Sequence, residues 1–279
     1  MSSKLIPSDP DEVMVIRNIT PNIVTLSVPF SRFGVVHVGG RATIIRMTTG
    51  NLAVFSPVAL THSVKAKLAE LGGTVDYLVA GDIEHHIFLS EWKREFPAAK
   101  VIGPEGLPEK RAKVHNDDKI TPIDFHHVLT DENHDGRGLD QDFLADFDVE
   151  YVGAHANKEV VLHHKPDRVL IQADLFFNLP AVEQYSRVPA AQRQDGGVVH
   201  GLLNRFFQSF QSTQGEAKGN KRFQWYVLSA GNRQKYNESV RRIHAWDFDT
   251  VIPCHGETME KNGKEIFNKV FQWHIQGSK

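Results

Sequence analysis

Residues 77–89, YLVAGDIEHHIFL, decide the fold of this chain. The stretch opens with an apolar run, residues 77–80, of the kind that forms a buried parallel strand. Four side chains able to bind a metal follow at once: Asp82, Glu84, His85 and His86. In α/β folds, ligand-binding groups collect just beyond the carboxyl ends of such strands. Carboxylates and imidazoles this close together favour a cation among them, and the alternative is a solvated loop.

Strands and helices alternate around this stretch. Segments rich in β-branched residues at 22–28 and 42–47 predict an opening antiparallel sheet. The chain then continues with a predicted strand at 51–57, a helix at 61–71, a strand at 74–80, a helix at 90–96 and a strand at 97–103. This alternation predicts parallel strands joined by right-handed crossovers.

The second half of the chain predicts further strands, with candidate ligands at their ends. The predicted elements are strands at 147–152, 159–164, 168–174 and 248–257, and helices at 236–246 and 262–275. His155, Asp174 and His255 each fall at or just after the end of a strand. His163 and His164 are expected at the surface of a hairpin. Residues 178–222 are interpreted as a mobile or lid-like insertion, and the aromatic segment 176–225 is a candidate lining for a substrate pocket.

Composition restricts the classes of protein to consider. The 279 residues are 41% apolar and 24% charged, which is typical of a globular chain, and a single domain over residues 1–279 is expected. A net charge of −2 argues against a nucleic-acid partner. The single cysteine, Cys254, fits a reducing compartment. No apolar run reaches about eighteen residues, so a cytoplasmic protein without a membrane partner is expected. The oligomeric state is left open.

The order of these motifs resembles the metallo-β-lactamase superfamily. The resemblance is carried by Gly-x-His at 153–155, Leu-Ile-x-x-Asp at 170–174 and Val-Ile-Pro-x-His-Gly at 251–256. It implies an α/β fold, a four-layered αβ/βα sandwich, with metal held between the two sheets. The superfamily's first motif, His-x-His-x-Asp-His, is altered here to Asp82-x-Glu84-x-His86-Ile87, or, shifted by one residue, it uses His85 and His86. An uncharacterised branch of the superfamily is therefore expected.

The same resemblance assigns the metal ligands. The second-motif histidine falls on His155, the bridging aspartate on Asp174 and the last histidine on His255. With the altered first motif, the candidate ligands are Glu84, His85, His86, His155, Asp174 and His255. Zinc is the first choice of divalent metal, with one or two ions. The added carboxylates would also suit manganese or iron.

A metal with an open position activates water, so hydrolysis of a small-molecule ester, lactone, thioester or amide is the predicted reaction. Asp82 or Glu84 would orient the nucleophile or carry its proton. Two alternatives remain open. One is a pseudoenzyme or binding module that keeps the fold, with or without a metal. The other is an iron or manganese oxidoreductase or lyase.

Overall fold

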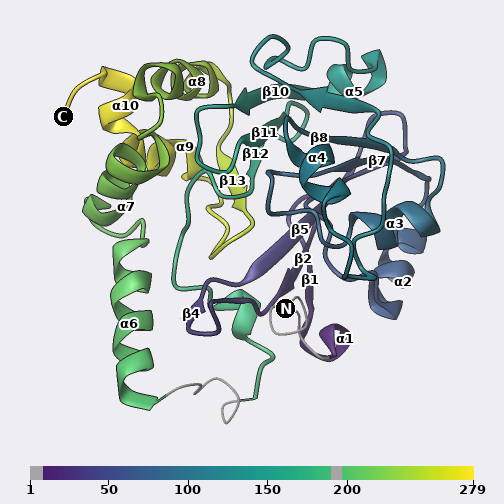
Figure 1. Cartoon of the computed structure of the whole chain (residues 1–279), viewed down its shortest axis with the longest axis horizontal. Coiled ribbons are helices and arrows are strands. Elements are labelled where there is room, and N and C mark those ends of the chain that lie inside the picture. The colour runs from purple at the N-terminus through teal and green to yellow at the C-terminus, as the bar shows by residue number, and fades with distance from the viewer. Residues whose placement is uncertain (1–8, 190–196) are drawn as a thin grey trace.

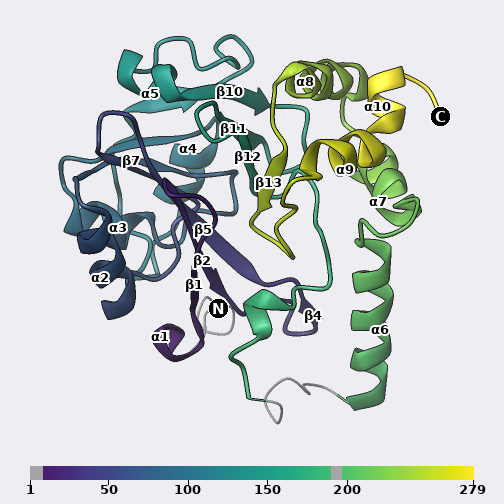
Figure 2. The same cartoon turned by 180° about the vertical axis from the view of Figure 1, so that it is seen from behind.

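Two mixed β-sheets form the centre of the chain in the computed structural model, which describes residues 9–189 and 197–279 (Figures 1 and 2). The first sheet has the order β1 (Val15–Asn18), β2 (Ile23–Val28), β5 (Gly40–Arg46), β6 (Leu52–Phe55), β7 (Val75–Val79), β8 (Lys100–Pro104) and β9 (His127–Leu129). Its first four strands pair antiparallel, and pairing is parallel from β6 onward. The second sheet has the order β10 (Phe147–Val152), β11 (Glu159–His164), β12 (Val169–Gln172) and β13 (Thr250–Pro253), with only β12 and β13 parallel.

Helices cover the outer face of each sheet, and a small hairpin, β3 (Ser31–Arg32) and β4 (Val36–His37), projects beside the first. The helices of the first half are α1 (Pro10–Val13), α2 (His62–Leu71), α3 (Leu89–Glu95), α4 (Leu107–Ala112) and α5 (Gln141–Asp146). Those of the second half are the 3-10 turn η2 (Glu183–Tyr185), α6 (Gly197–Phe210), α7 (Lys218–Phe223), the π-helical turn η4 (Gln224–Leu228), α8 (Arg233–Ala245), α9 (Gly263–Val270) and α10 (Gln272–Gln276).

Three hydrophobic cores separate four layers. Alternate residues of a strand point to opposite faces, so Ile23 packs between the sheets while Val24 packs against the helices α2 to α4. In the same way Ile171 lies between the sheets and Leu170 faces the helices α8 and α9. This arrangement confirms the predicted αβ/βα sandwich.

The strands that precede the candidate ligands end at one edge of the sandwich. β12 and β13 are parallel neighbours with Gln172 opposite Pro253, so Asp174 and His255 emerge side by side. β7 reaches the same edge from the other sheet through Gly81. A side chain at Gly81 would come within 2.7 Å of Ala173 Cβ, so glycine lets the two sheets approach here.

Several predicted details differ in the structure. His163 and His164 are buried, because β11 is an inner strand covered on both faces, so their expected surface position is wrong. The expected final helix 262–275 is divided at Phe271 into α9 and α10. Of the predicted insertion 178–222, residues 190–196 lie outside the described part. Within the described residues, no helix combines the length and the apolar character needed to cross a membrane.

Candidate metal centre

Three ligand atoms from three strand ends converge at the shared edge of the sheets. Among the described residues, one group of three metal-competent side chains has ligand atoms within 4.8 Å of one another: His85, Asp174 and His255. His85 Nε2 lies 3.2 Å from His255 Nε2, and His255 Nε2 lies 2.9 Å from Asp174 Oδ1. His85 follows β7 of the first sheet, and the other two follow β12 and β13 of the second. The site therefore bridges the two halves of the fold.

The partners of the remaining ring nitrogens set the tautomers of both imidazoles. His85 Nδ1 lies 2.8 Å from the Asp82 carboxylate, and His255 Nδ1 lies 2.6 Å from the carbonyl oxygen of Gly39. Both partners only accept hydrogen bonds, so each Nδ1 carries a proton. The Nε2 atom of each neutral ring then presents a lone pair to the other and to Asp174. Three acceptors facing one another require a positive charge between them.

The pKa values of His85 and Asp174 also indicate that the cluster favours a positive charge at its centre. Burial opposes a charge on His85, but Asp82 and Asp174 outweigh it and raise the pKa of His85 to about 9. Burial favours the neutral form of Asp174, yet the imidazoles of His255, His85 and His155 hold the pKa of its carboxyl well below the usual range. The cluster therefore favours one bound positive charge, which can be a proton or a metal cation.

The spacing of the acceptors fits a small divalent metal. Ligand atoms about 2.0–2.1 Å from a tetrahedral ion lie roughly 3.3 Å from one another. The Nε2–Nε2 separation of 3.2 Å is close to this value. Asp174 Oδ1 is buried and accepts no hydrogen bond from a described residue. Two imidazoles and one carboxylate are a donor set typical of zinc and of non-haem iron, and three protein ligands leave a position open.

Two residues that the sequence analysis did not single out hold Asp174 in place. Glu159 is fully buried and accepts hydrogen bonds from the backbone N–H groups of Ala173 at 2.6 Å and Asp174 at 2.9 Å. Burial, with Asp82 and Asp174 nearby, raises the pKa of Glu159 well above its usual value. Asn157 Nδ2 donates to Asp174 Oδ2 at 2.6 Å, leaving Oδ1 for the centre. Glu159 could have been noticed in the sequence, because it is a charged residue at the start of the apolar run that forms β11.

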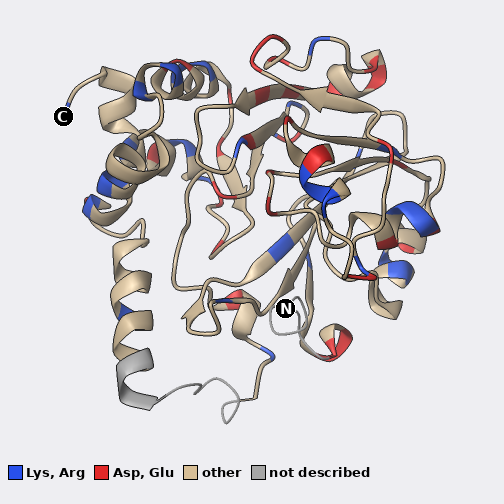
Figure 3. Cartoon of the chain, viewed as in Figure 1, with Lys and Arg blue, Asp and Glu red and all other residues tan. Residues whose placement is uncertain are grey.

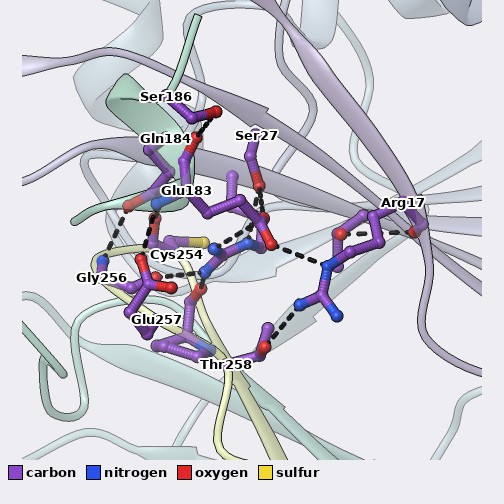
Figure 4. Close-up of polar contacts among 12 residues, drawn as sticks. Arg17, Ser27, Glu183, Gln184, Ser186, Cys254, Gly256, Glu257 and Thr258 are labelled. Atoms are coloured by element: carbon purple, nitrogen blue, oxygen red, sulfur yellow. Dashed lines mark hydrogen bonds and ion pairs between the residues drawn. The ribbon is translucent and has the colours of Figure 1, made fainter.

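A second group of missed residues fixes the turn that carries His255. The buried Arg41 donates from Nη1 to the carbonyl oxygens of Pro253 at 2.6 Å and Gly256 at 2.7 Å. Gln184 donates to Cys254 O at 2.8 Å and accepts from the Gly256 backbone N–H at 2.9 Å (Figure 4).

Glu183 ties this network to the opening strands. It accepts a hydrogen bond from Ser27 and forms ion pairs with Arg17 at 2.7 Å and Arg41 at 3.2 Å (Figure 4). The signal in the sequence was again a charge, Arg41, at the start of a β-branched run. The turn is thus held on both sides by side chains from other elements, and His255 is presented in one orientation.

The structure does not bring Glu84 and His86 into the cluster. Glu84 is exposed and its carboxylate lies 2.6 Å from Lys110 Nζ on α4. His86 is buried 3.1 Å from Arg111 on the same helix, and burial together with Arg111 and Lys110 lowers its pKa to about 3. Both side chains contact α4, whereas His85 contacts Asp82 and His255.

Asp82 and His155 lie beside the cluster. Asp82 Oδ1 accepts from the backbone N–H groups of Glu84 and His85 as well as from the His85 ring, and its Oδ2 is buried without a described partner. His155 Nδ1 accepts from the Asn157 backbone N–H at 3.1 Å, so the neutral ring carries its proton on Nε2. An Nε2–H group offers no lone pair. The metal-binding role expected for His155 stays a prediction.

A cavity of about 740 Å³ opens onto the two imidazoles. His85 and His255 form part of its wall, and Glu84 lies at it as well. Most of the remaining lining is apolar: Val28, Phe30, Phe33, Val58, Ile87 and Phe88. No described residue of the aromatic segment 176–225 lines this cavity, in contrast to the expectation from sequence. The opening strands and the turn at 84–88 provide the walls instead.

Comparison with known proteins gives the family and the fold. A family model described as "Domain of unknown function (DUF4336)" matches residues 31–228. No curated protein matches the chain in sequence.

Solved structures resemble it over nearly its whole length. The metal-soaked Flv1 flavodiiron core from Synechocystis sp. PCC6803 has a TM-score of 0.59 at 13% identity over 94% of this chain, which spans 60% of that protein. The metallo-β-lactamase FIM-1 from Pseudomonas aeruginosa, in its mono-zinc form, has a TM-score of 0.54 at 12% identity, covering 95% of this chain and 96% of that one. A metallo-β-lactamase from Erythrobacter litoralis has a TM-score of 0.58 at 10% identity, with 95% and 97% covered. At these identities the likeness establishes the metallo-β-lactamase fold.

Proposed function

The chain belongs to the family described as a domain of unknown function (DUF4336), and from its site we propose that it is a hydrolase using one divalent metal, zinc first, held by His85, Asp174 and His255. The observation that carries this proposal is the convergence of two Nε2 lone pairs and one unprotonated carboxylate oxygen. With both imidazoles neutral and protonated on Nδ1, these three atoms are all acceptors, and one metal ion can bind all three.

The bound metal would supply a water of lowered pKa and would polarise a carbonyl or phosphoryl oxygen. The chain's own residues prepare the site for it. Asp82 holds the proton of His85 on Nδ1 and fixes the ring plane, and the Gly39 carbonyl does the same for His255. Such second partners of ligating histidines orient the ring and raise its basicity. Asp82, which we expected to be catalytic, is better supported as a positioning residue.

The cavity indicates the kind of substrate. Its largely apolar wall suits a small molecule with a hydrophobic body, and two of the three candidate ligands, His85 and His255, face this space. A carbonyl group of an ester, lactone, thioester or amide bound there would meet the two imidazoles at one end of the cavity. The proton-carrying role expected for Glu84 stays a prediction, since Glu84 lines the cavity while its carboxylate pairs with Lys110.

A second candidate rests on the donor set itself. Two imidazoles and one carboxylate with open positions are also the ligands of non-haem iron oxygenases. The chain would then be an iron oxidoreductase on the same fold. A closed structural site, as in a binding module, normally has four protein ligands, whereas three converge among the described residues.

Metal content decides between these possibilities. The purified chain is dialysed and its metals are measured by elemental analysis, together with the variants His255→Ala and Asp174→Ala. We expect about one zinc per chain and its loss in both variants, while His62→Ala, an exposed histidine on α2, serves as the matched control and keeps the metal. Turnover of a panel of esters, lactones and thioesters should follow zinc content. Redox-active iron would support the oxygenase, and equal metal content in all variants would contradict the site.

A further inference from the structure

A second surface, on α6 and the segments that follow it, combines exposed apolar side chains with positive charge. Seven large hydrophobic side chains are exposed among the described residues, and five of them fall on α6 and η4: Leu202, Leu203, Phe206, Tyr226 and Val227. Both views show α6 at the outer edge of the molecule, with α7 next to it (Figures 1 and 2). These exposed groups lie on adjoining elements, because α6 contacts α7 and η4 continues directly from α7. Exposed apolar groups that gather in this way mark an interaction site.

Helix α6 has one packed face and one open face. On the packed face, Asn204 accepts a hydrogen bond from the His37 backbone N–H, and Phe207 packs against the cluster of Val38, Leu179 and Ala181. Leu202 and Phe206 are one helical turn apart on the opposite face, where residues at i and i+4 are neighbours. Phe206 is 69% exposed, so this face is not covered by the chain's own described residues.

The open face continues from α6 onto α7. Phe206 stacks on Phe210 with ring centroids 6.0 Å apart, and Phe210 meets Phe223 of α7 edge to face at 6.3 Å. A shallow hollow of about 440 Å³ lies between the two helices, lined by both aromatic and basic groups, among them Phe206, Phe210, Lys218 and Arg222. We call the surface formed by Leu202, Leu203, Arg205, Phe206, Arg222, Tyr226 and Val227 the α6–α7 face.

The charge of this region is opposite to that of the rest of the chain. Residues 201–241 contain seven Lys and Arg and two Asp and Glu, a net charge of +5 in a chain whose total is −2. Blue segments accordingly gather on α7 and α8 in Figure 3. Among the described residues, neither Arg205 nor Arg222 forms an ion pair.

We propose that the α6–α7 face binds the surface of a membrane rich in anionic phospholipid. Helices that lie in a membrane interface present apolar side chains flanked by Lys and Arg, and each cation near the surface adds attraction to the anionic headgroups. Leu202, Phe206 and Tyr226 would enter the headgroup layer, and Arg205 and Arg222 would meet the phosphates. The absence of an apolar run of about eighteen residues predicted no membrane partner, but contact at the membrane interface needs no spanning segment.

The positive charge of the α6–α7 face favours a lipid surface over a second copy of the chain as its binding partner. Two α6–α7 faces brought together would place like charges against each other, which opposes a symmetric dimer. The face is also a projecting helix beside a shallow hollow, a shape suited to a deformable lipid surface.

The test is sedimentation of the full-length chain with vesicles of phosphatidylcholine alone and with vesicles in which a third of the lipid is phosphatidylglycerol. We expect binding only to the anionic vesicles, and binding about tenfold weaker for the double variant Arg205→Gln/Arg222→Gln. Phe206→Ser should weaken it as well. The double variant Lys65→Gln/Lys113→Gln removes the same charge from α2 and the end of α4 and should bind like the parent chain.

The same variants show which outcomes would overturn the proposal. Equal binding to both kinds of vesicle, no binding to either, or equal loss in the two double variants would each contradict it. The solution mass of the parent chain and of Phe206→Ser is measured by light scattering in parallel. A dimer that dissociates in Phe206→Ser would show that a second copy covers this face and would also overturn the lipid proposal. Far-ultraviolet circular dichroism confirms that Phe206→Ser remains folded.

Discussion

At the scale of single residues, the candidate metal centre depends on atoms that do not face its middle. The proton on Nδ1 of each imidazole is fixed by an acceptor behind the ring, Asp82 for His85 and the Gly39 carbonyl for His255. Because each ring has only two nitrogens, a proton on Nδ1 leaves the Nε2 lone pair of each imidazole facing the centre. The side chain of Asp82 therefore supports the site by orienting a ligand, without facing the centre itself.

Replacing Asp82 by Asn tests this dependence. An amide can still accept the hydrogen bond from His85 Nδ1, but it lacks the negative charge that raises the basicity of Nε2. We expect the affinity for zinc to fall by about 10–100-fold, the usual effect of losing such a partner. Titration against a chromophoric zinc chelator measures the change. Glu84→Gln removes the same charge two residues away and should leave the affinity within about twofold. A larger loss of zinc affinity in Glu84→Gln than in Asp82→Asn would contradict this prediction and would indicate that Glu84 is a metal ligand.

At the scale of elements, the site is made by turns whose shape allows only certain residues. Gly256, directly after His255, has φ of +88°, a conformation that favours glycine. A Cβ atom there would lie 2.1 Å from the carbonyl oxygen of Asn178. The turn after β13 is thus packed against the chain after β12, and the spacing between His255 and Asp174 depends on it.

Gly256→Ala should accordingly damage both stability and metal binding. The strained φ alone costs about 1–3 kcal/mol, and relief of the clash with Asn178 must move the turn. We expect a loss of unfolding free energy of at least this size in urea denaturation, together with weaker zinc binding. Gly201→Ala on α6 is the control, since its Cβ would meet no atom within 4 Å and should stabilise the helix by about 0.5–1 kcal/mol. Unchanged zinc affinity in Gly256→Ala would contradict the coupling.

Most elements could be predicted from the sequence, since their signals are local. Apolar runs marked β7, β12 and β13, and the polar residues at their ends indicated the edge at which the ligands meet. Glu84 and His86 could not be placed in this way. Their partners, Lys110 and Arg111, belong to α4. These contacts decide the direction in which each side chain leaves the turn at 82–88. Arg41, Gln184 and Glu159 were missed because their roles arise only from contacts between distant segments.

At the scale of the whole molecule, stability should depend on pH through buried histidines. His274 of α10 is buried against α8, where its Nδ1 lies 2.7 Å from Asn237 Oδ1. Burial, with Arg233 nearby, lowers the pKa of His274 from 6.5 to about 4. The folded chain then binds fewer protons than the unfolded chain between these two pH values, so stability is complete above pH 6.5 and is lost as pH falls toward 4.

The contribution of His274 amounts to up to about 3 kcal/mol across this window. In His274→Gln, which cannot be protonated, the unfolding free energy should fall less steeply between pH 6.5 and 4 than in the parent chain. Urea unfolding curves at several pH values measure the slope. The same slope in both proteins would show that His274 does not contribute.

Because His85 emerges from one sheet and both Asp174 and His255 from the other, the proposed metal would cross-link the two halves of the sandwich. The unfolded chain does not hold these three groups together, so the ion binds only after both halves have docked and adds its binding energy to their association. Chelation should therefore loosen the contact between the sheets before it unfolds either one, and amide hydrogen exchange along the inner faces of β7 and β12 would record that loosening.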